Sequence, residues 1–241
     1  MENNQSQGGL GTAVDHRPLM SDERLGQVLE LRRTLASDGS EPAGEETVSF
    51  NGLTLKVPSQ VMTPCPVSHM LGKKILAEVT ESDRVLDMGA GSGSLGILAA
   101  TRAARVFAVD INPHAVEAAR ANAASNGVAD RYEVRQSDVF SAVEGTFDLI
   151  IFNPPFQWFA ARDVADSATT DENYGALTTF FKQVREHLAE NGRMIIFFST
   201  MGDVNYLLKL IDEAGFHREV VLEHTAPVAD VPVDFAAYRL S

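Results

Sequence analysis

The run from Val85 to Gly93, VLDMGAGSG, is the feature that most constrains the fold of this chain. Apolar residues lead into an acid, Asp87, and then into the alternating glycines Gly89, Gly91 and Gly93. Glycine permits a tight turn and lets a ligand approach the backbone, because no Cβ stands in the way. The apolar segment LGILAA that follows predicts a helix with its N-terminus toward that ligand. The run therefore predicts a strand, a nucleotide-binding turn and a helix.

The glycine turn alone leaves two kinds of ligand open. Residues 91–96, GSGSLG, also satisfy the pattern of dinucleotide-binding proteins, and Asp110 lies at a suitable distance downstream to bind a ribose. Such a match is weak when it stands by itself. Two further features favour a different ligand. Asp87 stands before the first glycine, and the NPPF run from Asn153 to Phe156 follows a second apolar segment at 147–152.

Taken in this order, the motifs resemble those of the class I S-adenosylmethionine-dependent methyltransferases, and among these the small-domain and glutamine N-methyltransferase types. The resemblance covers roughly residues 60 to 241. It implies an α/β fold with a Rossmann-like, seven-stranded, mostly parallel sheet, helices on both faces and an antiparallel C-terminal strand. It also implies S-adenosyl-L-methionine as the cosubstrate.

The resemblance assigns acids at three strand ends to the cofactor. Asp87 lies near the methionine moiety, Asp110 binds the ribose hydroxyls, and Asp138 meets the adenine amine. A carboxylate can accept hydrogen bonds from two vicinal hydroxyls or from an exocyclic amine, so this chemistry is also sound on its own. A turn or helix cap explains Asp138 equally well, and a nicotinamide site stays an alternative for Asp87 and Asp110. The predicted cofactor-binding residues are Asp87, Gly89, Gly91, Gly93, Asp110, Ile111 (against the adenine), Asp138, Val139 and Asn153.

The NPPF motif carries the predicted chemistry. The side-chain carbonyl of Asn153 and the backbone carbonyl after it accept hydrogen bonds from an amine or amide, while the ring of Phe156 stacks on a planar substrate. Transfer of a methyl group to nitrogen needs geometry and desolvation more than a strong base, because the departing sulfonium is a good leaving group. A Pro-Pro turn that merely ends a strand is the alternative. The predicted catalytic residues are Asn153, Pro154, Phe156 and Tyr174.

Aromatic residues after the motif motivate a second hypothesis. Trp158, Phe159 and Tyr174 either belong to the core of a lid or line an aromatic chamber that attracts a sulfonium cation, with Tyr174 supplying a hydroxyl. Such a chamber is similar to that of the cyclases of this fold. In those enzymes the α-amine of S-adenosylmethionine, then the sole substrate, attacks its own γ-carbon, which forms azetidine-2-carboxylate and releases methylthioadenosine. The sequence does not separate this reaction from methyl transfer to a small-molecule or protein amide or amine.

The chain divides into an N-terminal extension, residues 1–60, and a catalytic domain, residues 61–241. The extension contains a tail, a helix that begins near Ser21, a linker and a hairpin at Asn51-Gly52. We expect it to form a lid, with the Pro-containing loop 57–64 lying over the cofactor. In the catalytic domain strands alternate with helices, which predicts a parallel sheet that binds ligands at the carboxyl ends of its strands. Strands are predicted near 84–88, 105–109, 131–134, 147–152, 193–198, 218–224 and 234–240.

Composition indicates one soluble domain. A chain of 241 residues with 44% hydrophobic content can bury one sizeable core. No segment reaches the roughly 18 apolar residues that span a membrane, and the N-terminus is polar, so we expect a cytoplasmic protein. Cys65 is the single cysteine, and no cluster of cysteine and histidine indicates a metal site.

The charge of the chain bears on its partners. There are 33 acidic and 20 basic residues, which gives a net charge of −13, and the basic residues form no long run. Proteins that bind duplex DNA or folded RNA neutralise several phosphates with a basic face, so a nucleic-acid substrate is disfavoured and a small-molecule substrate is expected. The oligomeric state stays open. The histidines, with His16 in the tail, receive no catalytic role.

Overall fold

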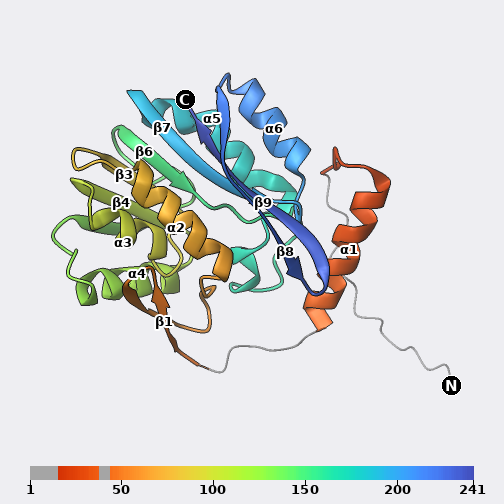
Figure 1. The fold of residues 1–241 in the computed structure, drawn as a ribbon, viewed down its shortest axis with the longest axis horizontal. Helices are drawn as coiled ribbons and strands as arrows, with labels where there is room; N and C mark the ends of the chain where they lie inside the picture. Colours follow the sequence, from red (N-terminus) through yellow and green to blue (C-terminus); the bar gives the residue numbers. More distant parts are fainter. Residues whose placement is uncertain (1–15, 38–43) are drawn as a thin grey trace.

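The computed structural model describes residues 16–37 and 44–241 (Figure 1). The predicted tail, apart from its last two residues, and most of the predicted linker lie outside the described residues. The described part contains a two-stranded hairpin and a seven-stranded sheet that is flanked by helices.

The large sheet has the strand order β5-β4-β3-β6-β7-β9-β8. The pairs among β5, β4, β3, β6 and β7 are all parallel, whereas β9 is antiparallel to both β7 and β8. This arrangement confirms the predicted fold class. The strands are β3 (Arg84–Met88), β4 (Arg105–Asp110), β5 (Tyr132–Gln136), β6 (Phe147–Phe152), β7 (Leu188–Ser199), β8 (Arg218–Val228) and β9 (Val231–Leu240).

Helices cover both faces of this sheet. Alternate residues along one strand, such as Val85 and Leu86 in β3, enter two different hydrophobic clusters, because successive side chains of a strand point to opposite faces. The first cluster contains buried residues of α2 (Pro66–Glu78), α3 (Ser94–Ala100) and α4 (Pro113–Ser125), and the second contains those of α5 (Gly175–His187) and α6 (Val204–Glu213).

One strand begins earlier than predicted. β7 starts at Leu188 rather than near residue 193, and its pairing with β6 shifts register between Phe147 and Leu149. Leu188 continues the apolar spacing of α5, so the sequence pattern places it on the helix face. The helix ends instead at His187, because Leu188 adopts an extended conformation.

The N-terminal elements pack in two separate places. The hairpin of β1 (Glu46–Phe50) and β2 (Leu53–Val57) turns at Asn51 and Gly52, which both have positive φ as the predicted Asn-Gly turn requires. It lies beside α4, whereas α1 (Asp22–Ser37) lies near β8 and β9 (Figure 1). The predicted cap of α1 is confirmed, since the Ser21 hydroxyl accepts a 3.2 Å hydrogen bond from the Arg24 amide. The role of residues 1–60 as a lid stays a prediction.

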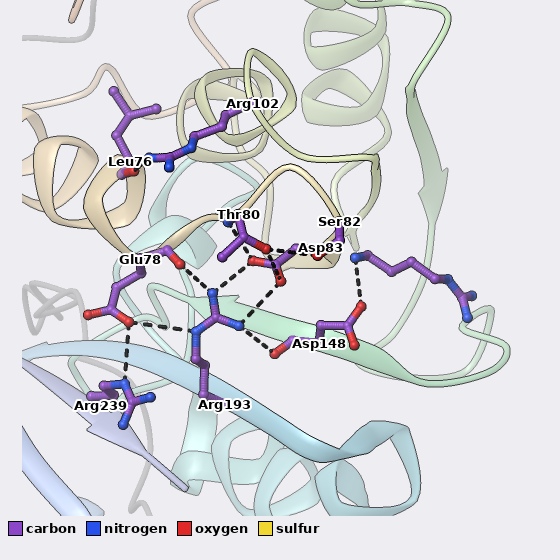
Figure 2. Close-up of polar contacts among 10 residues, drawn as sticks. Leu76, Glu78, Thr80, Ser82, Asp83, Arg102, Asp148, Arg193 and Arg239 are labelled. Carbon is purple, nitrogen blue, oxygen red and sulfur yellow. Dashed lines mark hydrogen bonds and ion pairs between the residues drawn. The ribbon is translucent and has the colours of Figure 1, made fainter.

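A network centred on Arg193 holds the end of the sheet where the parallel strands begin (Figure 2). The guanidinium binds the carboxylate of Asp83 at 2.7 Å and the Asp148 carbonyl at 3.0 Å, and it also contacts Glu78 at the end of α2. Arg239 of β9 reaches the same Glu78 carboxylate at 3.3 Å. Helix α2 and three neighbouring strands are thereby fixed together, at the opposite end from the glycine turn.

Within the described parts of the chain, every helix is too short or too polar to cross a membrane.

Candidate active site

A cavity of about 320 Å³ lies where the parallel strands end. The glycine turn after β3, the ends of β4 and β6, the loop at 60–64 and the segment at 167–172 line it. The structure thus brings together most of the predicted residues, namely Asp87, Gly89, Gly91, Asp110, Ile111, Asp138, Val139 and Asn153. Loop residues near Met62 were expected at this place. Gly93, Pro154, Phe156 and Tyr174 are not among the described residues that line the cavity.

The glycines of the turn serve two different purposes. Gly91 has φ +54° and open space where a Cβ would stand, so the backbone there faces the cavity without obstruction. Gly93 has φ +84°, and a Cβ there would lie 2.6 Å from Ile97 and 3.1 Å from Ala119. Gly93 therefore permits the turn and the close packing of α3 on α4, which explains why it does not line the cavity.

Asp87 is a buried acid at the end of β3, only 2% exposed. Its carboxylate accepts a 2.9 Å hydrogen bond from the amide of Gly96. Burial raises the pKa of Asp87 to about 7, the Gly96 hydrogen bond opposes this rise, and the nearby charge of Asp110 adds to it. A buried carboxylate with one hydrogen bond would be stabilised by a cationic group of a ligand.

Asp110 anchors the glycine turn from the end of β4. One carboxylate oxygen accepts the Gly91 amide at 2.8 Å, and the other accepts the Asn112 amide at 2.8 Å. Burial raises the pKa of Asp110 although these hydrogen bonds favour its charged form. Each oxygen can accept a further hydrogen bond. Ile111, the next residue, lines the cavity with 58% of its surface exposed, as expected of a residue that awaits a flat ligand.

Asp138 and Val139 line the cavity beyond β5. Val139 has φ +46°, a left-handed conformation that a β-branched residue rarely adopts. Its carbonyl accepts a 2.8 Å hydrogen bond from the hydroxyl of Ser137, which helps to hold this conformation. Strain of this kind is found at ligand sites, where the surrounding structure enforces it.

Asn153 ends β6 at the cavity wall. Its side-chain oxygen is buried and has no hydrogen-bond partner among the described residues. A buried acceptor without a partner costs free energy, so this oxygen is available to an N–H or O–H donor of a ligand. The same applies to the hydroxyl of Ser92 in the glycine turn, a residue 2% exposed whose contribution the sequence patterns did not indicate.

The structure places Phe156 and Tyr174 behind the cavity rather than in it. The Phe156 ring packs edge-on against Phe198, with centroids 5.4 Å apart, and also against Phe197. Tyr174 is fully buried, and its hydroxyl donates to the Phe156 carbonyl. The Tyr174 ring belongs to the core and its hydroxyl is used by the Phe156 carbonyl, which does not fit a hydroxyl inside an aromatic chamber. The Phe156 ring is partly buried, and its stacking on a substrate stays a prediction.

A cover segment, residues 157–174, follows the NPPF motif, and several of its members line the cavity. Asp171 in this segment accepts hydrogen bonds from the amides of Ala176 at 2.9 Å and Leu177 at 2.8 Å, and so satisfies two backbone donors in the first turn of α5. Burial raises the pKa of Asp171, and these amides oppose the rise. The lining residues of the cover segment are Ser167, Ala168, Thr170, Asp171 and Glu172.

The N-terminal segment holds the cover segment from outside. Arg32 of α1 donates to the Gln157 side chain at 3.1 Å, and its guanidinium lies 4.1 Å from the centroid of the Phe159 ring. The His16 side chain is 5% exposed and contacts the buried Asp203 carboxylate at 3.2 Å. No local pattern indicates these contacts, because each joins residues more than a hundred positions apart.

The ionisable side chains that line the cavity are all acidic among the described residues. Of the described residues that line it, Asp87, Asp110, Asp138, Asp171 and Glu172 carry carboxyl groups and none is Lys, Arg or His. A ligand with phosphates would meet no countercharge there. S-adenosylmethionine fits, because its sulfonium and ammonium groups are cationic and its ribose and adenine supply hydrogen-bond donors.

A parallel sheet with a glycine turn and acids at its strand ends defines a Rossmann-like nucleotide-binding enzyme. The family model of the methyltransferase small domain matches residues 67–221. The chain belongs to this family and is an S-adenosylmethionine-dependent methyltransferase.

Similar proteins include several glutamine methyltransferases. A Methanocaldococcus jannaschii protein, provisionally named a protein N5-glutamine methyltransferase, is 30% identical over 80% of this chain and 99% of its own length. The release factor glutamine methyltransferase of Cereibacter sphaeroides is 40% identical over 72% of this chain and 66% of its own length. The ribosomal RNA small subunit methyltransferase C of Chromohalobacter salexigens is 39% identical, but the match spans only 30% of its length.

Solved structures agree on the fold. The ribosomal protein L11 methylase of Lactobacillus delbrueckii has a TM-score of 0.51 and 26% identity over 70% of this chain and 74% of its own. The tRNA m1G37 methyltransferase of M. jannaschii has a TM-score of 0.61 and 21% identity over 84% of this chain and 59% of its own. At this identity the second likeness concerns the fold alone.

Proposed function

We propose that this protein transfers the methyl group of S-adenosylmethionine to the side-chain amide nitrogen of a protein, with glutamine as the acceptor residue. The observation that carries this proposal is the buried, unpartnered side-chain oxygen of Asn153 at the cavity wall. An amide NH₂ would satisfy that oxygen and would be held in line with the sulfonium methyl group.

The same proposal assigns the cofactor to the acids at the strand ends. Asp87 binds the ammonium group of the methionine moiety, and Asp110 binds the ribose hydroxyls while it holds Gly91. Asp138 accepts from the adenine amine beside Ile111 and Val139. This assignment is supported by the position of all five residues on one cavity, between the glycine turn and the end of β5.

The proposed reaction needs no strong base in the protein. The acceptor nitrogen bonds to the methyl carbon as the carbon–sulfur bond breaks, which leaves S-adenosylhomocysteine, and the nitrogen then loses one proton to water. The task of Asn153 is to orient the nitrogen, and a well-oriented pair of reactants gains much of the rate enhancement from geometry. Catalysis therefore depends on where the NPPF backbone stands.

Three observations favour a protein acceptor over a small molecule or a nucleic acid. Two relatives that align over most of this chain and of their own length carry names that refer to glutamine methylation in a protein. The described lining carries carboxylates without a cation, which disfavours phosphates. At the rim, Met62 is 45% exposed, and an exposed apolar side chain at this place is suited to contact a polypeptide.

The test is methyl transfer from labelled S-adenosylmethionine to a bacterial release factor, with a small-amide panel as the comparison and mass spectrometry to locate the methyl group. We expect a methylated glutamine with the wild type and at least a hundredfold slower transfer with Asn153→Ala. Asp110→Ala should weaken cofactor binding measured by calorimetry. Full activity of Asn153→Ala, or methylation of the small amides alone, would overturn the proposal.

Intramolecular cyclisation of S-adenosylmethionine is the second candidate. The same Asn153 oxygen would serve it, because that oxygen could accept a hydrogen bond from the α-amine of S-adenosylmethionine in place of an acceptor amide. Incubation with S-adenosylmethionine alone separates the two reactions. Equal amounts of methylthioadenosine and azetidine-2-carboxylate would establish cyclisation, and unchanged S-adenosylmethionine would favour transfer to an acceptor.

A further inference from the structure

Asn122 of α4 and Asn126, the C-cap residue of that helix, pair with the free edge of the N-terminal hairpin. The side chain of Asn126 accepts from the Thr54 amide at 3.1 Å and donates to the Thr54 carbonyl at 2.9 Å. Asn122 repeats both contacts with Lys56, at 2.9 Å each. The two side-chain amides thus replace a neighbouring strand along β2, whose other edge pairs with β1.

The match between helix and strand has a geometric basis. Four residues of a helix rise about 6.0 Å, and two residues of a strand rise about 6.8 Å. Asparagines four apart on α4 therefore face strand residues two apart, and in a strand these residues present their backbone groups to the same edge. An amide side chain carries both a donor and an acceptor, so it can complete each position fully.

Asn122 makes one contact that Asn126 does not. Its nitrogen also donates to the backbone carbonyl of Ser92 at 2.9 Å, and the side chain is 1% exposed. Ser92 stands in the glycine turn, next to Gly91, whose amide is held by Asp110. The turn is therefore fixed on one side by an acid of the cavity and on the other by an asparagine that lies outside it.

We propose that Asn122 is a positioning residue for the cofactor. It holds the Ser92 carbonyl, and through it the glycine turn, at the place where the unpartnered Ser92 hydroxyl and the Gly91 backbone face the cavity. The hairpin thereby becomes a support of the cofactor site, since Lys56 occupies the remaining groups of the Asn122 amide. This inference rests on the proposed placement of S-adenosylmethionine at the glycine turn.

The experiment compares Asn122→Ala with Asn126→Ala in the full chain. Both variants lose a pair of hydrogen bonds to β2, and both should unfold at a lower temperature. Binding of S-adenosylhomocysteine, measured by calorimetry at a temperature where both variants are folded, separates them. We expect Asn122→Ala to raise Kd roughly five- to tenfold, the effect of one lost hydrogen bond at the site, and Asn126→Ala to leave Kd within twofold.

A second readout excludes a merely structural role. Hydrogen exchange of the Gly91 and Gly93 amides should accelerate in Asn122→Ala but not in Asn126→Ala. Equal Kd values for the two variants, or unchanged exchange in the turn, would overturn the positioning role. Asp110→Ala serves as the reference: if it binds S-adenosylhomocysteine as tightly as the wild type, the placement of the cofactor is wrong, and the failure lies with the proposed function instead.

Discussion

The hydroxyl of Tyr174 lies 2.7 Å from the carbonyl oxygen of Phe156, to which it donates a hydrogen bond, and it accepts one from the Asp203 amide, also at 2.7 Å. Gly202 packs directly against the same Phe156 carbonyl and leaves no room for a side chain, because a Cβ there would lie 1.8 Å from the Phe156 oxygen. The backbone three residues after Asn153 is therefore clamped from behind. We therefore expect Tyr174 to affect catalysis through this backbone rather than by contact with the substrate.

Tyr174→Phe should slow catalysis while cofactor affinity is retained. The change removes the donor to Phe156 and leaves the buried Asp203 amide without its acceptor, which should cost about 1–3 kcal/mol of unfolding free energy. A small displacement of the NPPF backbone should lower kcat roughly ten- to hundredfold. Tyr206→Phe is the matched control, since Tyr206 stacks on Tyr174 but its hydroxyl, among the described residues, is hydrogen-bonded to Thr178 and not to the NPPF backbone. Equal kcat values for the two variants would contradict the clamp.

Gly96→Ala should weaken cofactor binding without touching the cofactor. A Cβ on Gly96 would lie 2.5 Å from the Asp87 carboxylate and 3.0 Å from Tyr132, so the carboxylate must move. We expect a rise of roughly tenfold in the Kd of S-adenosylhomocysteine and a stability loss of about 1–3 kcal/mol. In Gly26→Ala the new Cβ meets open space on α1, so that variant should instead gain about 0.5–1 kcal/mol. Calorimetry and thermal unfolding of both variants check this.

Cofactor affinity should depend on pH through Asp87. Its pKa is raised to about 7 in the free protein, chiefly by burial, so the group is mostly neutral at pH 6. Because an ammonium ligand favours the ionised carboxylate, S-adenosylhomocysteine should bind roughly tenfold more tightly at pH 7.5 than at pH 5.5. Asp87→Asn should bind weakly at both values. The same raised pKa means that the stability of the free protein falls as pH rises from about 4 toward 7, because over this range Asp87 loses its proton more readily in the unfolded chain than in the folded one.

The Asp83–Arg193 pair should stabilise the fold at neutral pH and lose this contribution in acid. Burial raises the pKa of Asp83, but hydrogen bonds from Arg193 and Thr80 outweigh it, so the net shift is downward. A lowered folded-state pKa contributes stability that is present above the unfolded value of about 3.9 and is lost as pH falls below it. Asp83→Asn should cost about 3 kcal/mol at pH 7 and almost nothing near pH 2. Urea unfolding at several pH values measures this, and an equal loss at both ends would refute it.

Much of the fold could be predicted because most of the parallel strands, namely β3, β4, β6 and β7, contain a short apolar run that is followed by a polar residue. The strand from 84 to 88 and the hairpin at Asn51-Gly52 appear where their local patterns place them. The start of β7 was missed because Leu188 satisfies the helical spacing of α5 as well as the pairing with Phe147. Periodicity cannot decide between two elements that share a residue.

The site was predictable as far as it is built from strand ends. Asp87, Asp110 and Asn153 meet on one cavity because parallel strands finish at the same edge of the sheet. The stacking of Phe156 on a substrate stays a prediction, and local sequence could not show that its ring also packs against Phe197 and Phe198. Contacts such as His16 with Asp203 have no local pattern, because they depend on how distant segments dock.

Strand β9 lies between β7 and β8 although it follows both in the chain. In the described sheet β8 pairs with β9 alone, so during synthesis β8 leaves the ribosome before its partner exists. The family match ends at residue 221, inside β8. A protein truncated there would expose the long edge of β7, and bare strand edges invite other chains to pair with them. The boundary drawn by sequence similarity would thus yield an aggregating fragment rather than a minimal enzyme.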